Sequence, residues 1–367
     1  MRVRASIAGR LLAGTTIIAT AILIVVGAAS AQVFSEGPLS PGTVVNDASV
    51  GTALWVNPGN AAVSDDALAT TAPGGTPTQY LEATSFGFSL PAPAQVVGIE
   101  ATVERRSIAG TVVDSAVRIV KGGVVGTADR SDAGFWMAGS DEIITYGSNS
   151  DLWGETWTPA DINSAGFGVA VSATDSFDTA GVDHITMTVY YTLCGPAPTT
   201  GCRTSQKSIL IVNDKTPDSK DKVVWKWIKG ASTSTAEFAD PLNSAVYSLC
   251  VYSGVAVGTA STLIANASVP SDATKWTPIS TKGFKYLDKN TTQDGIRKIV
   301  LKASVDNKAK AIVKGKGELL PTLTPPFDLP VTVQLVNSDS GICWEGSYDT
   351  LDIKKNEAGK FKGKALN

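Results

Sequence analysis

Apolar and polar residues alternate with a period of two in several short runs of the N-terminal half. Residues 97–105, VGIEATVER, place valine, isoleucine and alanine on one face and two glutamates and a threonine on the other. The runs 86–90, 167–171 and 184–191 follow the same pattern. Successive side chains of a β-strand point to opposite faces, so the pattern predicts half-buried strands. Turn sequences rich in glycine, proline and aspartate separate them, as is typical of an antiparallel β-sandwich.

The C-terminal half alternates as well, but many of its polar positions are lysines. Residues 221–230, 295–304, 308–317 and 360–364 alternate lysine with apolar residues or glycine. The run 331–336 is a further predicted strand, and no long segment shows the 3.6-residue apolar period of a helix. We therefore expect an all-β protein made of two antiparallel β-sandwich domains.

Charge divides the chain near residue 193. Residues 32–193 hold 5 Lys/Arg and 18 Asp/Glu, a net charge of −13, whereas residues 194–367 hold 23 and 16, a net charge of +7. The first 31 residues add +3, and the three parts sum to the whole-chain charge of −3. A step of this size predicts an acidic domain over 32–193 and a basic domain over 203–367. It also allows self-association between the oppositely charged domains of neighbouring molecules.

The first 31 residues have the features of a cleaved signal peptide. Three arginines accompany the 16-residue apolar stretch 11–26, and Ala29 and Ala31 occupy the positions that a signal peptidase reads. The alternative is an uncleaved anchor, but at 1.5 Å per residue the stretch reaches only about 24 Å of a roughly 30 Å hydrocarbon core. We expect cleavage between Ala31 and Gln32, and a mature chain without a membrane span in the medium, at the cell surface or in the periplasm.

The cysteines of an exported protein are expected to form disulfides. Four cysteines permit three pairings. We favour Cys194–Cys202, which would staple a Pro/Gly-rich linker over 194–202, together with Cys250–Cys343. The spacings do not fit a four-cysteine metal site.

Parts of both halves resemble modules of uncharacterised secreted bacterial proteins. Residues 151–173, DLWGETWTPADINSAGFGVAVSA, and 182–192, VDHITMTVYYT, are similar to a jelly-roll-like β-sandwich domain that also occurs in phage-associated surface proteins. The strings DKVVWKWIKG, YSLCVYSG, DGIRKIVLKA and CWEG resemble a lysine-rich, cysteine-stapled β module of unknown function, which covers about 203–364. These resemblances imply a fold, a domain boundary and the Cys250–Cys343 pairing. They imply no reaction and no functional residue.

Residues that would carry out catalysis are scarce. His184, the single histidine, lies on the polar face of a predicted strand, and Asp183 points to the opposite face. A catalytic base needs a nucleophile and an orienting partner, and a zinc site needs three or four ligands, so we expect His184 to be structural. No motif of a serine hydrolase, a nucleotide-binding loop or a zinc protease is present, and we expect no enzyme. The alternative is an extracellular glycan hydrolase that uses a carboxylate pair.

Two sets of side chains suggest binding. The tryptophans of the acidic domain would either fill its core or stack on sugars from exposed loops: Trp55, Trp136, Trp153 and Trp157. The alternating lysines would either be a solvated sheet face that protects edges, or bind a polyanion such as an acidic polysaccharide: Lys298, Lys302, Lys308, Lys310, Lys314 and Lys316. No nucleic-acid motif is present, and we expect no specific nucleic-acid recognition.

One segment has the oxygen ligands of a calcium site. Residues 288–295, DKNTTQDG, miss the EF-hand spacing because Gln293 stands where glycine is needed, so we expect a turn and no cofactor, with Ca²⁺ as the alternative. The sequence predicts an exported binding or structural protein, held by its basic domain to polysaccharide or to an anionic cell envelope. A self-assembling spacer in a surface layer is the further alternative.

Overall fold

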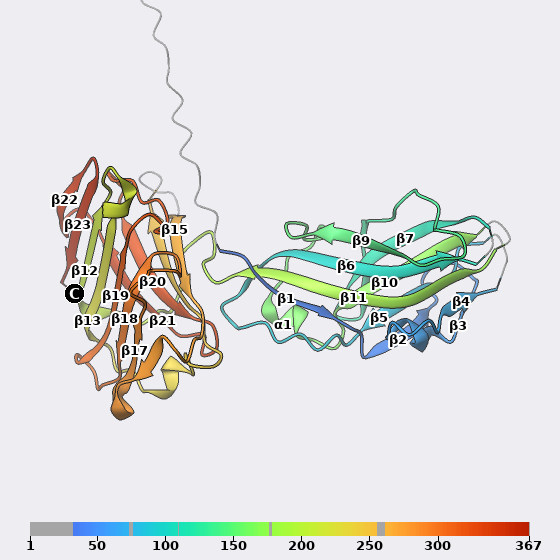
Figure 1. Cartoon of the computed structure of the whole chain (residues 1–367), viewed down its shortest axis with the longest axis horizontal. Coiled ribbons are helices and arrows are strands. Elements are labelled where there is room, and N and C mark those ends of the chain that lie inside the picture. The colour runs from blue at the N-terminus through green and yellow to red at the C-terminus, as the bar shows by residue number, and fades with distance from the viewer. Residues whose placement is uncertain (1–31, 73–75, 109, 176–177, 255–260, 367) are drawn as a thin grey trace, which may run out of the picture.

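The described residues form two antiparallel β-sandwiches joined by a short linker (Figure 1), which confirms the expected fold class. The computed structural model describes residues 32–72, 76–108, 110–175, 178–254 and 261–366. The expected signal peptide, 1–31, lies outside them. In the described part of the chain, no helix is long and apolar enough to cross a membrane.

The N-terminal sandwich packs a six-stranded sheet against a five-stranded sheet. The first runs, in spatial order, β3 (Trp55–Val56), β4 (Ala69–Thr71), β11 (Ala180–Thr192), β6 (Gln95–Ser107) and β9 (Glu142–Ser148), and β1 (Phe34–Leu39) also pairs with β11. The second runs β2 (Thr43–Asp47), β5 (Tyr80–Thr84), β10 (Gly168–Asp175), β7 (Val112–Lys121) and β8 (Val124–Asp129). Two short helices lie in the connections, η1 (Pro58–Ala61) and α1 (Pro159–Ile162).

The strand order of this sandwich is that of a jelly roll. With β4 to β11 numbered 1 to 8, the two sheets have the orders 1-8-3-6 and 2-7-4-5. A jelly roll consists of eight strands in two sheets, built from two Greek keys. The topology therefore agrees with the jelly-roll-like fold that the sequence resemblance implies for the acidic domain.

The C-terminal sandwich packs an eight-stranded sheet against a four-stranded sheet. The eight-stranded sheet runs β16 (Trp276–Pro278), β17 (Gly283–Leu287), β18 (Ile296–Lys302), β19 (Ala309–Lys316), β13 (Lys222–Gly230), β12 (Ser205–Asn213), β23 (Lys360–Ala365) and β22 (Ile353–Glu357). The four-stranded sheet runs β15 (Thr262–Val269), β14 (Tyr247–Ser253), β20 (Val331–Asn337) and β21 (Cys343–Tyr348). Single turns of 3-10 helix occur at η2 (Asp218–Lys220), η3 (Ala236–Phe238) and η4 (Ser280–Lys282).

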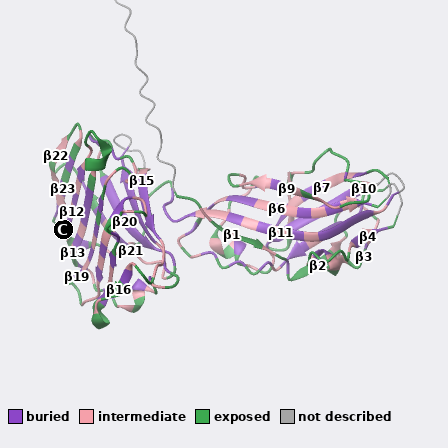
Figure 2. Ribbon diagram, viewed as in Figure 1, coloured by how far each residue is buried: buried purple, intermediate pink, exposed green. Residues whose placement is uncertain are grey.

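Period-two alternation places the core between the sheets of each sandwich. Along β6, for example, Ile99, Ala101 and Val103 are fully buried, while the residues between them are partly exposed. Figure 2 shows the same alternation of buried and less buried residues along β6 and β11. The apolar positions read from the sequence are therefore the positions that hold each sandwich together by removing apolar surface from water.

Three of the four tryptophans of the N-terminal sandwich are buried, so the interpretation as exposed stacking rings is wrong for them. Their indole N–H groups donate to acceptors inside the domain: Trp55 to Gln79 O (2.9 Å), Trp136 to Asp114 Oδ1 (2.8 Å) and Trp153 to Ile99 O (3.0 Å). A buried indole whose N–H is satisfied costs little, which explains its place in the core. Trp157 is half-buried and packs edge-on against Phe167.

The expected disulfide pairing is also wrong. The bonds are Cys194–Cys250 and Cys202–Cys343. Cys250 lies on β14 and Cys343 on β21, and β20 runs between these strands. Two strand spacings are about 9.5 Å, beyond the roughly 7 Å between Cα atoms that a disulfide can bridge. Each linker cysteine is instead bonded to one of the two strands.

The linker therefore lies along the four-stranded sheet. Gln334 on β20 holds it between the two disulfides, because its side chain accepts from Thr199 N (3.0 Å) and donates to Thr199 O (2.7 Å). The four-stranded sheet lies on the side of its domain that is nearer the N-terminal sandwich, and the eight-stranded sheet lies on the far side (Figure 1). The outer face of the eight-stranded sheet thus points away from the rest of the molecule.

Candidate functional site

The outer face of the eight-stranded sheet is covered with lysines. Side chains that alternate with the buried core positions of β12, β13, β17, β18, β19, β22 and β23 share this face. Its thirteen lysines, which we call the lysine face, are Lys207, Lys222, Lys226, Lys285, Lys298, Lys302, Lys310, Lys314, Lys316, Lys355, Lys360, Lys362 and Lys364.

Four pairs of these lysines stand directly opposite each other on neighbouring strands. The pairs are Lys298–Lys314, Lys302–Lys310, Lys222–Lys316 and Lys355–Lys362. Directly opposed side chains on one face lie about 5 Å apart at Cβ, and like charges in this position destabilise a sheet. The register of the strands therefore concentrates positive charge at a cost in stability.

Few carboxylates offset this charge. Glu357 lies on the same face and forms an ion pair with Lys355 at 2.6 Å. Among the residues that the structure describes, no other lysine of the face takes part in an ion pair. The side chains of the lysine face are half-buried or exposed, so their ammonium groups are available to an external anion.

Aliphatic residues occupy the positions between the lysines. Half-buried side chains lie among the lysines in the middle of the sheet, with Val300 directly opposite Ile312 and Lys226 between Ile312 and Ile209: Ile209, Ile211, Ile228, Val300 and Ile312. The aromatic residues of these strands point inward and lie in or against the core: Trp225, Trp227, Phe284, Tyr286 and Phe361. The outer face offers ammonium and aliphatic groups, which suits a dense anion better than the stacking of neutral sugars.

Five of the six lysines predicted from the sequence lie on this face. Lys308 lies in the turn before β19, where its N–H donates to Val305 O. The other eight lysines of the face come from strands distant in the sequence, β12, β13, β17, β22 and β23. Their local alternation was visible, but only the strand order reveals that they share one surface.

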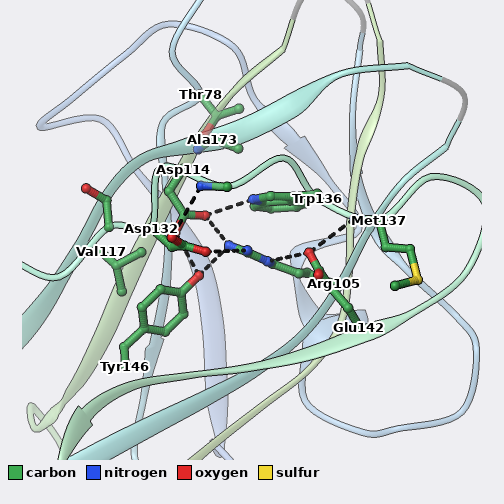
Figure 3. A network of polar contacts seen from close by, with 12 residues as sticks. Thr78, Arg105, Asp114, Val117, Asp132, Trp136, Met137, Glu142, Tyr146 and Ala173 are labelled. Atoms are coloured by element: carbon green, nitrogen blue, oxygen red, sulfur yellow. Dashed lines mark hydrogen bonds and ion pairs between the residues drawn. The ribbon is translucent and has the colours of Figure 1, made fainter.

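A second cluster of charged residues lies inside the N-terminal sandwich, around Arg105 (Figure 3). The guanidinium donates to Asp114, to Tyr146 Oη (2.5 Å) and to Glu142 Oε1 (3.1 Å), and it lies 4.9 Å from the centre of the Trp136 ring. The side chains of Arg105 and Asp114 are both 0 % exposed. Burial, and next the charge of Asp114, raise the pKa of Tyr146 far above its ordinary value.

The buried cluster around Arg105 stabilises the fold of the N-terminal sandwich. Burial leaves a substrate no access to Asp114, whose carboxylate already accepts from Arg105, Trp136 and Tyr146. Breaking such a buried pair is expensive, because it leaves one charge without a partner. The sequence contained a signal for it, since the alternation that buries Val103 also turns Arg105 inward.

His184 makes a hydrogen bond with Ser40, with 2.9 Å between Nε2 and Oγ. Glu104 is its cross-strand neighbour, yet among the described residues no ion pair joins His184 to a carboxylate. Catalysis by a serine and a histidine also requires a group that orients the imidazole and donors for an oxyanion. The half-buried His184 and the exposed Ser40 therefore share a hydrogen bond near the surface in which no carboxylate of the described residues pairs with the imidazole.

The segment 288–295 forms a turn built around Asp288. The carboxylate of Asp288 accepts from the N–H groups of Asn290 and Thr292 (2.9 Å each) and lies 3.3 Å from Lys275 Nζ. Asp294 accepts from Ser268 N instead. Over the described ranges, no three potential metal-ligating side chains of His, Cys, Asp or Glu gather at one point.

The C-terminal sandwich contains a small cavity at the end of β12 and β13. This cavity, beside Val212, Val223 and Leu323, has a volume of 10 Å³, which is room for about one water molecule. Comparison with protein-family models, with curated proteins and with solved structures finds no match for this chain. Its function must therefore be inferred from the surfaces described above.

Proposed function

We propose that this is an exported binding or structural protein that attaches to an anionic polymer, an acidic polysaccharide or a cell-envelope component, through its lysine face. The acidic jelly roll is then the part that the attached molecule presents to its surroundings. Two disulfides are compatible with an oxidising compartment outside the cytosol.

The opposed lysine pairs are the observation that carries this proposal. A sheet that needed only a solvated outer face would alternate lysine with carboxylates, because opposite charges across strands stabilise it. Here Lys298, Lys302 and Lys222 each face another lysine instead. A bound polyanion relieves this repulsion, so the cost in stability is recovered on binding.

Protection of sheet edges does not explain the arrangement. Lysine on an edge strand blocks the pairing of a further strand. In the eight-stranded sheet the edges are β16 and β22, whereas β19, β13 and β12 lie in the interior and carry Lys310, Lys314, Lys222, Lys226 and Lys207. Lysines on interior strands serve the face of the sheet and not its edges.

The placement of the domains supports attachment. The lysine face lies at one end of the molecule, and the N-terminal sandwich extends away from the opposite side of the C-terminal domain (Figure 1). Disulfides at Cys194 and Cys202 fix both ends of the linker to the four-stranded sheet. A molecule bound flat by its lysine face would thus direct its acidic sandwich away from the anionic surface.

The test is salt-dependent binding of the mature chain, residues 32–367, to immobilised polygalacturonate. A variant with Lys298, Lys302, Lys310 and Lys314 replaced by serine should lose binding, since attraction between solvent-exposed charges is weakened when the charge is removed or screened. The matched control replaces four exposed lysines outside the face, Lys215, Lys220, Lys282 and Lys289, and keeps the same net charge. Equal loss in both variants would contradict a specific role for the face.

A further inference from the structure

The loop between β8 and β9 exposes two large apolar side chains of the acidic sandwich. Phe135 is 70 % exposed and Met137 is 50 % exposed. The other aromatic residues that the structure describes are buried or half-buried. Phenylalanine and methionine are enriched in the centres of protein interfaces, so this loop, residues 130–141, has the side chains of a contact surface.

The buried cluster holds this loop in one conformation. Trp136 is inserted into the core between Phe135 and Met137, and its indole N–H donates to Asp114 Oδ1 (2.8 Å). Met137 N donates to Glu142 Oε1 (3.1 Å), and Met137 O accepts from Ser107 N (2.9 Å). Figure 3 shows Trp136 and Glu142 next to the Arg105 guanidinium. A loop fixed in this way loses little conformational entropy on binding.

Acidic side chains lie on this loop and on the neighbouring strand β6. The side chain of Asp132 is 51 % exposed, and Glu104 lies beside the exposed Ile143 on the outer face of β6 and β9. All five cations of the sandwich are already in ion pairs with its own carboxylates: Arg105, Arg106, Arg118, Lys121 and Arg130. A partner of this loop must therefore offer apolar groups within a positively charged surface.

The lysine face has this chemistry, with aliphatic side chains interspersed among thirteen lysines. We propose that the loop 130–141 of one molecule docks on the lysine face of a second copy of the chain. This proposal rests on the proposed function, because it takes the lysine face as an anion-binding surface and names a partner for it. A soluble polyanion and a second copy then compete for the same lysines.

One molecule cannot make this contact with itself. In β11 and β6, Thr192 pairs with Gln95 next to the linker, and Arg105 lies ten residues further along β6. At about 3.4 Å per residue the loop is roughly 34 Å from the linker. The lysine face points away from the N-terminal sandwich (Figure 1). A contact between two different surfaces at opposite ends of a molecule is heterologous, so it gives open chains, or rings where the rotation closes, and not isologous dimers.

The size of the surface predicts weak association. The lysine face spans seven strands, about 29 Å, by roughly 20 Å along the strands, so about 600 Å² is available. Stable complexes bury about 800 Å² per partner, which places this contact in the weak, reversible class. In low salt, we therefore expect the average molecular mass in solution to rise as the protein concentration increases from about 5 to 200 µM. High salt should return the protein to the monomer.

Sedimentation velocity of the mature chain tests the proposal directly. The variant Phe135→Ser with Met137→Ser should weaken self-association by at least about tenfold, as loss of a central aromatic contact does. Its control replaces two other exposed apolar side chains, Val63→Ser with Val124→Ser, and should associate as the wild type does. The four-lysine variant should also be monomeric.

Mixing the two defective variants separates this contact from any other mode of association. The loop variant keeps an intact lysine face, and the lysine variant keeps an intact loop, so the mixture should form capped 1:1 dimers and no longer chains. Wild-type protein that stays monomeric at every concentration overturns the inference, even if it binds polygalacturonate. Self-association without binding to polygalacturonate would instead overturn the proposed attachment and leave the contact between copies standing.

Discussion

Lys298 on β18 and Lys314 on β19 lie directly opposite each other on the outer face of the eight-stranded sheet. Neither belongs to an ion pair of the described residues. Two ammonium groups in this relationship repel each other, and the same relationship recurs at Lys302–Lys310 and Lys222–Lys316. The C-terminal domain thus maintains a surface that is less stable than charge pairing would allow.

The first prediction is that replacing one lysine of such a pair by glutamate raises the stability of the fold and lowers the affinity for a polyanion. Lys314→Glu turns the pair with Lys298 into an attractive one, so the free energy of unfolding should rise by about 0.2–1 kcal/mol. Affinity for polygalacturonate should fall. Urea unfolding and a binding titration measure the two effects. Lys289→Glu, outside the face, is the control, and a Lys314→Glu protein that is destabilised would count against repulsion across the strands.

The second prediction concerns the buried arginine. Arg105→Met leaves the carboxylate of Asp114 buried without its cation, so it should lower the free energy of unfolding of the N-terminal sandwich by about 3–5 kcal/mol. Arg106→Met is the matched control, because Arg106 is partly exposed and pairs with Asp141 at 3.3 Å. The control should cost less than about 1 kcal/mol. Similar losses for both arginines would show that burial does not set the strength of this network.

The third prediction is that the disulfides stabilise the C-terminal sandwich. The bonds span 56 and 141 residues, for which the chain-entropy model gives about 4 and 5 kcal/mol as upper values. Cys194→Ser with Cys250→Ser should lower the unfolding midpoint of the C-terminal sandwich and leave the N-terminal one unchanged. Peptide mapping of the unreduced protein should recover Cys194 linked to Cys250. A peptide that links Cys194 to Cys202 would refute the linker geometry.

The fourth prediction is a pH dependence that arises from Asp288. Burial opposes its ionisation, but hydrogen bonds from Thr292 and Asn290 and from Lys275 outweigh burial and lower the pKa of Asp288 to about 2. An aspartate in the unfolded chain has a pKa of about 3.9. The ionised carboxylate therefore contributes stability that is complete above about pH 4 and is lost as the pH falls toward 2.

Asp288→Asn should remove this contribution. The variant should be less stable than the wild type at neutral pH, and its urea midpoint should change less between about pH 5 and pH 2. Asp306→Asn, an exposed change in the same domain, is the control. If the midpoint of Asp288→Asn follows the same pH profile as the wild type, the acid sensitivity of the domain has another source.

Local patterns predicted the strands well because a half-buried strand is a local property. The alternation over 97–105 is that of β6, and it marks the inward residues correctly. The sheet order is not local, and the disulfide pairing was wrong for that reason. Cys250 and Cys343 looked like natural partners along the sequence, but β20 runs between their strands.

For the candidate sites, too, local patterns identified single residues, and only the strand register showed which of them lie together. Single strands revealed the lysines, but the register of seven strands was needed to show that thirteen of them form one face. In the run Phe135–Trp136–Met137 all three residues are apolar, so the pattern does not say which one enters the core. Asp114, a buried acceptor from a different strand, binds the indole N–H and leaves Phe135 outside.

The most direct test of the central claim is a map of lysine reactivity. The mature protein is acylated with a lysine reagent, with and without polygalacturonate in low salt, and each lysine is quantified by mass spectrometry. The account predicts that the polymer protects lysines of the face, Lys298, Lys302, Lys310 and Lys314 among them, while Lys215, Lys282 and Lys289 react unchanged. Uniform protection of all exposed lysines, or protection confined to those outside the face, would contradict it.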